Sequence, residues 1–545
     1  MLSWLKNKKE RLIISLIILA VVLVSIAPLL YGYFIAGPQD HFLGAPYQLA
    51  ADYPVYLSMI EQGRQGNLVM KNLYTPELQN PSLISPLWLL LGLVGRVTNW
   101  SNVFLFHLAR VIAAIFFLYF LYFFVSCFFQ KFQSRLMVFV LLIFSSGLGS
   151  FFLPGENVWD VSVIFLKTPT DFWVSESNTF LTIYHSALFI LSQLLVVTIF
   201  YLFINRLSNR RILVLVLLSL ILGIFHPYDL VTIYAVLFVY LVFNFATDNK
   251  EWHKIKAYLP MVFVSSLALV YYYVITKSEI AIGGWSTQNY NISPPLFAYI
   301  TGYGLVLFLA ILGTFWVIRG KKDQFYFLVI WFLTSAFLLY APIAFQRRLS
   351  SGLHIPLALL AGLAIEKIWL ETKHHFVWRS VLAWIFIPLL FLSNIAVINQ
   401  DIHNYNQRDY PYFFPQEYYQ SFLWLKDNVD PAEVTLASPS IGNLIPAFAG
   451  RTVYAGHGHQ TVTYAAKIQE LSSQLMVSNT SDQERFGFFK KYQIEYFWYS
   501  DREKMISQFD PAAASYLEQI YSNSQVEIYR VKDTYSPAGC GCQKY

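Results

Sequence analysis

The chain has 545 residues, of which 56% are hydrophobic, 18% aromatic and only 13% charged, with a mean hydropathy of +0.47. This composition excludes a purely water-soluble globular protein and indicates one membrane unit with a smaller additional domain. The net charge of +6 is spread over many short loops, which is typical of membrane anchoring and not of nucleic-acid binding. Three cysteines are too few for a disulfide scaffold.

The apolar stretches predict about eleven membrane spans, because a helix that crosses a bilayer needs roughly 20 apolar residues. The first stretch continues to about Ile35 without a clear small-residue cleavage site, so we expect an uncleaved first helix. In chain order the predicted spans are residues 12–35, 103–128, 136–153, 180–204, 212–225, 228–246, 257–276, 293–318, 324–345, 353–371 and 380–398.

The loops between these spans fall into two alternating classes. Short basic loops, such as Arg206 to Arg211, favour the cytoplasmic side of a membrane. This alternation predicts a cytoplasmic N-terminus and an extracytoplasmic segment after residue 400. A span at residues 83–97 would reverse every later loop, so this segment is predicted to be an interfacial or re-entrant helix. The loops of the polar, aromatic and acidic class are residues 36–82, 154–179, 277–292 and 346–352.

Residues 400–545 differ from the rest because their apolar residues come in short runs separated by helical patterns. Val434–Ala437 and Ile494–Tyr499 read as strands, whereas Gln416–Leu425 and Gln460–Met476 read as helices. We therefore predict a polytopic α-helical membrane domain over 1–399, with a long first outer loop 36–102, and an extracytoplasmic α/β domain over 400–545.

A pair of arginines at an outer boundary is the first candidate site. Gln346, Arg347 and Arg348 end a predicted span where the positive-inside bias disfavours basic residues. Two guanidinium groups can hold a phosphate through bidentate hydrogen bonds. The alternatives are an anionic lipid headgroup or a structural salt bridge to a loop acid.

The second candidate is Asp52, which follows the first predicted span. Its carboxylate could take a proton from an attacking hydroxyl, or it could join Glu77 in holding a divalent cation such as Mg or Mn. Alternatively, Asp52 caps a helix that begins near Pro54, since Asp is a favoured N-cap residue and Pro suits the first turn. The capping role and a chemical role can coexist.

Further outer-face residues are candidates with open alternatives. The segment from His226 to Asp229 could contribute to a site or form a turn between spans. Arg110 could reach a headgroup or pair within the bundle. His457 and His459 point to opposite faces if their segment is extended, and no cysteine lies nearby to complete a zinc site. The full set of these candidates is Asp40, Tyr56, Arg110, His226, Tyr228, Asp229, His457 and His459.

The order of these features resembles GT-C fold glycosyltransferases, particularly the protein-mannosyltransferase and aminoarabinose-transferase type, and an uncharacterised bacterial branch of them. A first span is followed by a loop acid, an apolar segment beginning at Pro86, and Arg110 in the next span. In that family the loop acid is catalytic or binds metal; Asp52 matches it, and Asp40 is the competing match. The chain departs from the family in lacking an adjacent pair of acids, and Gln79–Ser82 replaces an acidic-basic-proline-proline element.

The resemblance implies transfer of a sugar from a polyprenyl-phosphate donor to an acceptor glycan, lipid or protein at the cell envelope. Arg347 and Arg348 would hold the donor phosphate, and Asp52 would deprotonate or orient the acceptor hydroxyl. One rival is a transporter or lipid flippase, which usually has polar residues near the bilayer midplane and internal repeats that this sequence lacks. Another is a binding protein whose outer domain recruits a partner.

Overall fold

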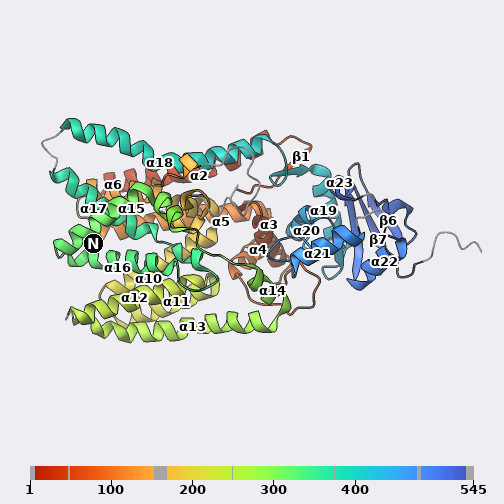
Figure 1. The fold of residues 1–545 in the computed structure, drawn as a ribbon, viewed down its shortest axis with the longest axis horizontal. Helices are drawn as coiled ribbons and strands as arrows, with labels where there is room; N and C mark the ends of the chain where they lie inside the picture. The colour runs from red at the N-terminus through yellow and green to blue at the C-terminus, as the bar shows by residue number, and fades with distance from the viewer. Residues whose placement is uncertain are drawn as a thin grey trace, which may run out of the picture. The chain divides into compact units, whose positions relative to one another are not determined.

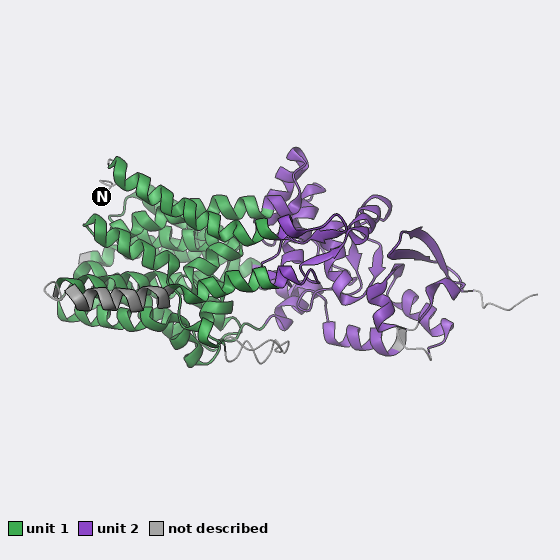
Figure 2. Ribbon diagram, turned by 90° about the horizontal axis from the view of Figure 1, so that it is seen from above, with its two compact units in different colours: residues 1–31, 106–271, 290–403 green, residues 32–105, 272–289, 404–545 purple. Residues whose placement is uncertain are grey.

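The computed structural model describes residues 7–46, 49–152, 168–247, 250–371, 376–475, 480–507 and 509–535. Residues 154–167 of the predicted outer loop 154–179 therefore lie outside the described residues. The chain divides into two compact units, which Figure 2 colours separately. Unit 1 comprises residues 1–31, 106–271 and 290–403, and unit 2 comprises residues 32–105, 272–289 and 404–545.

Unit 1 is a bundle of long apolar helices (Figure 1). Every one of the eleven predicted spans overlaps a helix, and within the described residues eight helices have both the length and the hydropathy of a membrane span. The polytopic α-helical fold is thus confirmed. The main helices over the predicted spans are α2 (Lys8–Ile35), α5 (Asn102–Ser126), α6 (Phe132–Phe144), α10 (Ala187–Ile204), α11 (Asn209–Phe225), α12 (Tyr228–Ala246), α13 (Ile255–Ser278), α15 (Leu296–Arg319), α16 (Asp323–Leu338), α17 (His354–Glu371) and α18 (Phe376–Asn406).

Two predicted spans are interrupted. Helix α6 ends at Phe144, and beyond it the buried carboxylate of Asp171 accepts hydrogen bonds from the main-chain N–H groups of Gly147 (2.8 Å) and Gly149 (3.2 Å). The predicted span 180–204 is divided by Ser186, whose extended backbone separates α9 (Thr179–His185) from α10. Hydropathy does not reveal these breaks, because side-chain acceptors and local backbone geometry make them.

The predicted first outer loop, residues 36–102, contributes a closely packed helix pair to unit 2. Helix α3 (Tyr53–Arg64) packs on α4 (Pro86–Thr98). A Cβ at Gly92 would come within 2.1 Å of the carbonyl oxygen of Ile60, so the helices approach this closely only because that position is glycine. At about 1.5 Å per residue, the 13 residues of α4 span about 20 Å, less than a hydrocarbon core of about 30 Å. The length of α4 agrees with the predicted interfacial helix.

The C-terminal part of unit 2 is an α/β domain, as predicted. Its five strands lie in the order β4-β3-β5-β7-β6; β3 pairs in parallel with β4 and β5, and the β5–β7 and β7–β6 pairs are antiparallel. Leu436, Phe489 and Phe497 are among its buried core residues. The strands are β3 (Val434–Leu436), β4 (Thr452–Val453), β5 (Ile494–Ser500), β6 (Leu517–Ser522) and β7 (Val526–Val531), and the helices are α19 (Gln416–Asn428), α20 (Pro439–Phe448), α21 (Tyr464–Glu470), α22 (Asp482–Lys491) and α23 (Asp501–Ile506).

The first outer loop and the C-terminal domain share unit 2, together with α14 (Ile280–Gln288). Strand β1 (Asp40–Phe42) pairs antiparallel with β2 (Phe413–Pro415). The buried Glu61 of α3 forms an ion pair with Lys426 of α19, with 2.7 Å between Oε1 and Nζ. The sequence predicts a single division after residue 399. These contacts explain why unit 2 instead also includes residues 32–105 and 272–289.

Candidate active site

Asp52 is at the N-cap position of α3, as the sequence predicts, but its side chain makes no capping hydrogen bond. Its Oδ1 lies 3.0 Å from Nε2 of His457, and the Asp52 side chain is 52% exposed. The carboxylate therefore contacts His457 and does not cap the first turn of α3. Asp52 and His457 are separated by 405 positions in the chain.

His457 is held from behind by the main chain of its own turn. Its Nδ1 accepts hydrogen bonds from the main-chain N–H groups of His459 and Gln460, both at 3.2 Å. The ring is buried and lies edge-on to Tyr74, with 6.1 Å between ring centroids. A histidine whose Nδ1 accepts two N–H groups carries its proton on Nε2, which is the atom facing Asp52.

His459 contacts a different partner. Its Nδ1 lies 3.0 Å from the main-chain oxygen of Gln288, the last residue of α14. The side chain of Gln288 in turn donates to the main-chain oxygen of Thr461 (2.8 Å). Residues 458–460 form a turn, not the extended segment on which the opposite-face prediction depended.

Glu77, predicted to hold a divalent cation together with Asp52, is paired with a basic side chain. Its Oε1 lies 2.7 Å from Nζ of the buried Lys467, and it accepts a short hydrogen bond from the hydroxyl of Thr75. Within the described residues, no group of three His, Cys, Asp or Glu side chains is placed to hold a metal ion. As arranged, Asp52 and Glu77 do not fit the divalent cation predicted for them.

Asp40 and Tyr56 have packing and pairing partners of their own. Asp40 lies in β1 with its Oδ2 3.8 Å from Arg408, and its side chain is 31% exposed. Tyr56 of α3 stacks on Trp88 of α4, with 4.8 Å between ring centroids. Of the two candidate acids, Asp52 is therefore the more accessible.

In unit 1, Arg348 lies in the short helix η5 (Gln346–Ser350) and forms a close ion pair with Glu176, which lies in the described part of the predicted outer loop 154–179. The Glu176 carboxyl is 5% exposed. Burial would raise its pKa, but Arg348 and Arg347 outweigh burial and lower the pKa to about 2. The salt bridge to a loop acid, one of the predicted alternatives, is thus formed by Arg348.

Arg347 makes contacts of another kind. Its Nη2 donates to Oδ1 of Asn291 at 2.6 Å, and its guanidinium lies 4.8 Å from the ring centroid of Trp173. Gln346 braces the same turn, because its side chain accepts from the N–H of Ser293 (3.1 Å) and donates to the main-chain oxygen of Ala341 (2.7 Å). The predicted phosphate-binding residues are thus fixed in a turn that aromatic and amide side chains support.

His226 and Pro227 form the break between α11 and α12, and Tyr228 and Asp229 begin α12. Nδ1 of His226 lies 3.0 Å from Oδ2 of the buried Asp229, which also accepts a short hydrogen bond from Ser192. The ring centroid of Tyr228 lies 6.0 Å from the guanidinium of Arg348. Tyr228 therefore lies beside Arg348. The contact between His226 and Asp229 holds the start of α12, which carries Tyr228.

Arg110 is used inside the bundle. Its guanidinium donates to the main-chain oxygens of Ile183 (3.3 Å), Tyr184 (3.1 Å) and Ser25 (3.3 Å), and only 2% of the residue is exposed. It thereby satisfies carbonyl groups in the last turn of α9 and one in α2. Sequence reasoning did not single out Asn291 and Ser192, since neither carries a charge or a motif.

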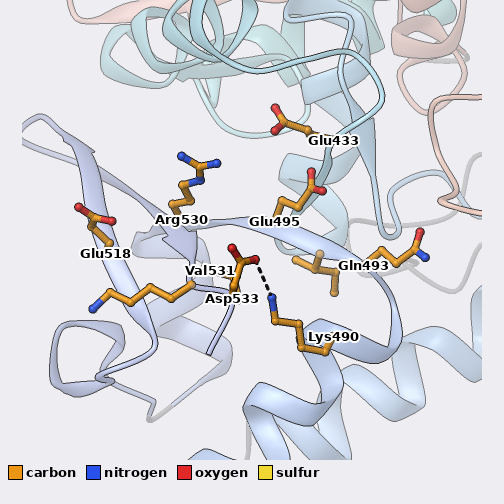
Figure 3. Close-up of a pocket in the computed structure, with 10 residues that line it drawn as sticks. Glu433, Lys490, Gln493, Glu495, Glu518, Arg530, Val531 and Asp533 are labelled. Atoms are coloured by element: carbon orange, nitrogen blue, oxygen red, sulfur yellow. Dashed lines mark hydrogen bonds and ion pairs between the residues drawn. The ribbon is translucent and has the colours of Figure 1, made fainter. Parts of the chain in front are cut away.

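A polar hollow on the α/β domain is a separate feature (Figure 3). Its volume, about 500 Å³, is within the range of ligand pockets, roughly 300–1,000 Å³, but such pockets are mostly apolar. Charged side chains of both signs line it, and Lys490 lies 3.5 Å from Asp533. None of the predicted site residues lines this hollow.

No protein-family model matches the chain, and the comparison with curated proteins finds no match in sequence. Solved structures match it in fold. The oligosaccharyltransferase AglB of Archaeoglobus fulgidus, solved with an inhibitory peptide and a dolichol-phosphate, has a TM-score of 0.53 and 12% identity, and the match covers 98% of this chain and 76% of that one.

Two other solved structures match with similar coverage of this chain. ArnT from Cupriavidus metallidurans, bound to undecaprenyl phosphate, has a TM-score of 0.53 and 10% identity, covering 96% of this chain and 99% of that chain. The mycobacterial arabinofuranosyltransferase AftD has a TM-score of 0.50 and 11% identity, covering 96% and 40% respectively. The chain therefore has the GT-C fold of polytopic membrane glycosyltransferases, as the sequence resemblance predicts.

Proposed function

We propose that this protein is a membrane glycosyltransferase that transfers a sugar from a polyprenyl-phosphate donor to an acceptor on the extracytoplasmic face of the cell membrane. The fold supports this proposal, since similar structures contain dolichol-phosphate or undecaprenyl phosphate. The observation that carries it is the half-exposed carboxylate of Asp52, placed at the start of α3 with its Oδ1 against His457. The acceptor is a glycan, a lipid or a protein.

In the proposed reaction the acceptor oxygen attacks the anomeric carbon of the donor sugar. The bond from that carbon to the phosphate oxygen breaks, and polyprenyl phosphate leaves with the electron pair. The Asp52 carboxylate takes the proton of the acceptor hydroxyl and later returns it to solvent. No step is derived through a cation, because the residues of the predicted cation pair do not fit one.

Arg347 and Arg348 are proposed to bind the donor phosphate. A planar guanidinium group presents paired N–H donors to phosphate oxygens and stabilises the charge that develops on the leaving group. Both guanidinium groups lower the pKa of Glu176, and Arg347 also contacts Asn291 and Trp173. Both arginines are therefore phosphate ligands in this proposal.

The topology is part of the same proposal. The basic loops would face the cytoplasm together with the N-terminus, and the α/β domain would face outward. There it would bind the acceptor. Accessibility of single cysteines introduced at Arg211 and Asp427 to a membrane-impermeant maleimide tests this, since only the second should react from outside.

The function is tested by incubating purified protein with a panel of radiolabelled undecaprenyl-phosphate hexoses and pentoses and measuring sugar release. Turnover of one donor that is lost in Asp52→Asn supports the proposal. Asp427→Asn, an exposed carboxylate on α19, is the matched control and should retain turnover. Turnover retained in Asp52→Asn but lost in Asp40→Asn would move the role to Asp40.

The transporter or flippase remains the alternative prediction. It predicts that reconstituted protein moves undecaprenyl-phosphate sugars across vesicles without cleaving them, and that Asp52→Asn leaves this movement unchanged. Sugar release that depends on Asp52 would reject it.

A further inference from the structure

We propose that His457 is a positioning residue, which presents a neutral Nε2–H group to Asp52 and thereby fixes the direction of the Asp52 carboxylate. The inference depends on the proposed function, because it assigns His457 a role in the reaction of Asp52. It goes beyond that function by identifying a residue of the C-terminal domain that sets the catalytic geometry of the first outer loop.

The tautomer follows from the partners of the ring. Two main-chain N–H groups, of His459 and Gln460, point at Nδ1 from 3.2 Å, so a proton on Nδ1 would face two donors. The remaining ring proton is then on Nε2, 3.0 Å from Oδ1 of Asp52. His457 therefore donates one hydrogen bond and adds no positive charge.

The turn that carries His457 is itself fixed at two points. A Cβ at Gly456 would come within 2.4 Å of the main-chain oxygen of Gly442, so the segment lies against α20 at a distance that only glycine permits. The N–H of Gly456 donates to the hydroxyl oxygen of Thr461 (3.0 Å), which donates to the main-chain oxygen of Tyr74 (2.8 Å). Neither the turn nor its histidine can shift without breaking these contacts.

The backbone next to Asp52 is held from the same domain. Asn443 of α20 donates from its side chain to the main-chain oxygen of Ala51 at 3.1 Å. The hydroxyl of the buried Tyr74 lies 3.4 Å from the main-chain oxygen of Asn443, and burial raises the pKa of Tyr74 well above its usual value, so this hydroxyl stays a donor. Asp52 is thus oriented through both its backbone neighbour and its side chain.

Losing the Nε2–H donor should lower turnover more than binding. Partners that orient metal-ligating side chains typically contribute about 10–100-fold to affinity or activity, and we take the same range for the Asp52 carboxylate. We therefore expect His457→Phe to lower kcat by about 10–100-fold with little change in KM. The acid limb of the kcat/KM profile should move to higher pH, because the charged form of Asp52 loses a hydrogen bond.

A conservative variant separates positioning from packing. In His457→Gln the side-chain NH₂ group can take the place of Nε2–H, so its kcat and pH profile should lie closer to wild type than those of His457→Phe. His403→Gln, an exposed histidine of α18, is the control for histidine replacement. Equal kcat and equal pH profiles for wild type and His457→Phe would overturn the inference.

A second measurement does not depend on turnover. In protein labelled with ¹⁵N-histidine and purified in detergent at pH 7.5, the His457 ring, assigned by its absence in His457→Gln, should show a proton on Nε2 only. A proton on Nδ1 would overturn the inference. Because this measurement uses the wild-type ring, it tests the inference even if His457→Phe does not fold.

The outcomes also separate the inference from the function. If Asp52→Asn is inactive while His457→Phe is fully active, the positioning role fails and the glycosyltransferase stands. If Asp52→Asn keeps turnover, the assignment of Asp52 as the catalytic base fails. The contact of His457 with Asp52 then has no role in the reaction, whichever ring nitrogen of His457 carries the proton.

Discussion

Replacing Glu176 with Gln should destabilise unit 1 but strengthen binding of the donor phosphate. The Glu176 carboxyl is buried and its pKa is lowered from 4.5 to about 2: burial would raise it, but Arg348 and Arg347 outweigh burial. At about 1.4 kcal/mol for each tenfold change in an equilibrium constant, this lowering corresponds to about 3 kcal/mol of stability at neutral pH. Removing one partner of a buried ion pair typically costs a similar amount, about 3–5 kcal/mol.

The pH dependence has a definite sign. Because the pKa of Glu176 is lower in the folded than in the unfolded chain, its contribution is complete above about pH 4.5 and is lost as the pH falls towards 2. The difference in unfolding free energy between wild type and Glu176→Gln should therefore be constant from pH 7 to pH 5 and shrink below pH 4.5.

The assay is denaturant unfolding in detergent, followed by tryptophan fluorescence at several pH values. Glu518→Gln, an exposed side chain of β6, is the matched control and should change stability by less than about 0.5 kcal/mol. Equal stability of wild type and Glu176→Gln at pH 7 would refute the assignment of a buried, charged pair. In the folded variant, Arg348 no longer shares its charge with a carboxylate, so undecaprenyl phosphate should bind more tightly.

Three other predictions test separate parts of the molecule. Arg347→Ala should weaken binding of undecaprenyl phosphate and lower the free energy of unfolding by less than Glu176→Gln does. Unchanged affinity for undecaprenyl phosphate would exclude a phosphate-binding role of Arg347. Turnover should survive EDTA, because Glu77, the second acid proposed to hold a cation, is already paired with Lys467; activity that is lost in EDTA and restored by Mg²⁺ or Mn²⁺ would support the predicted cation at Asp52 and Glu77 instead. Gly92→Ala should destabilise unit 2 by about 1–3 kcal/mol, since the added Cβ would lie 2.1 Å from the Ile60 oxygen, whereas Gly487→Ala, with open space around it, should not.

The membrane helices could be predicted from sequence because lipid imposes a simple rule on composition and length. Every predicted span overlaps a helix, and the strands at Val434 and Ile494 lie where the apolar runs are. The breaks at Ser145 and Ser186 could not be predicted in this way, since hydropathy is averaged over a span and apolar residues lie on both sides of each break. One of these breaks is held by Asp171, whose partners are main-chain groups that any sequence would offer.

The site residues could be named from sequence, but their partners could not. Arg348 and Glu176 are 172 positions apart, and Asp52 and His457 are 405 apart, so no spacing rule connects them. Charge arguments indicated that the arginine pair should be compensated, and Glu176 is the compensating acid. For Asp52 no such argument existed, because a hydrogen bond from a neutral histidine leaves no trace in composition or charge.

As a neutral donor, His457 differs from the side chains that pair with the other acids of the predicted first outer loop. Each of Asp40, Glu61 and Glu77 is paired with a basic side chain, respectively Arg408, Lys426 and Lys467. An adjacent cation favours the charged form of a carboxylate and makes it a weaker base. A hydrogen bond from neutral His457 orients Asp52 without itself adding a full charge, so it weakens the carboxylate as a base less than a cation in the same place would. Placing a cation at this contact, by His457→Lys, should therefore lower kcat and move the acid limb of the pH profile to lower pH, the direction opposite to that of His457→Phe.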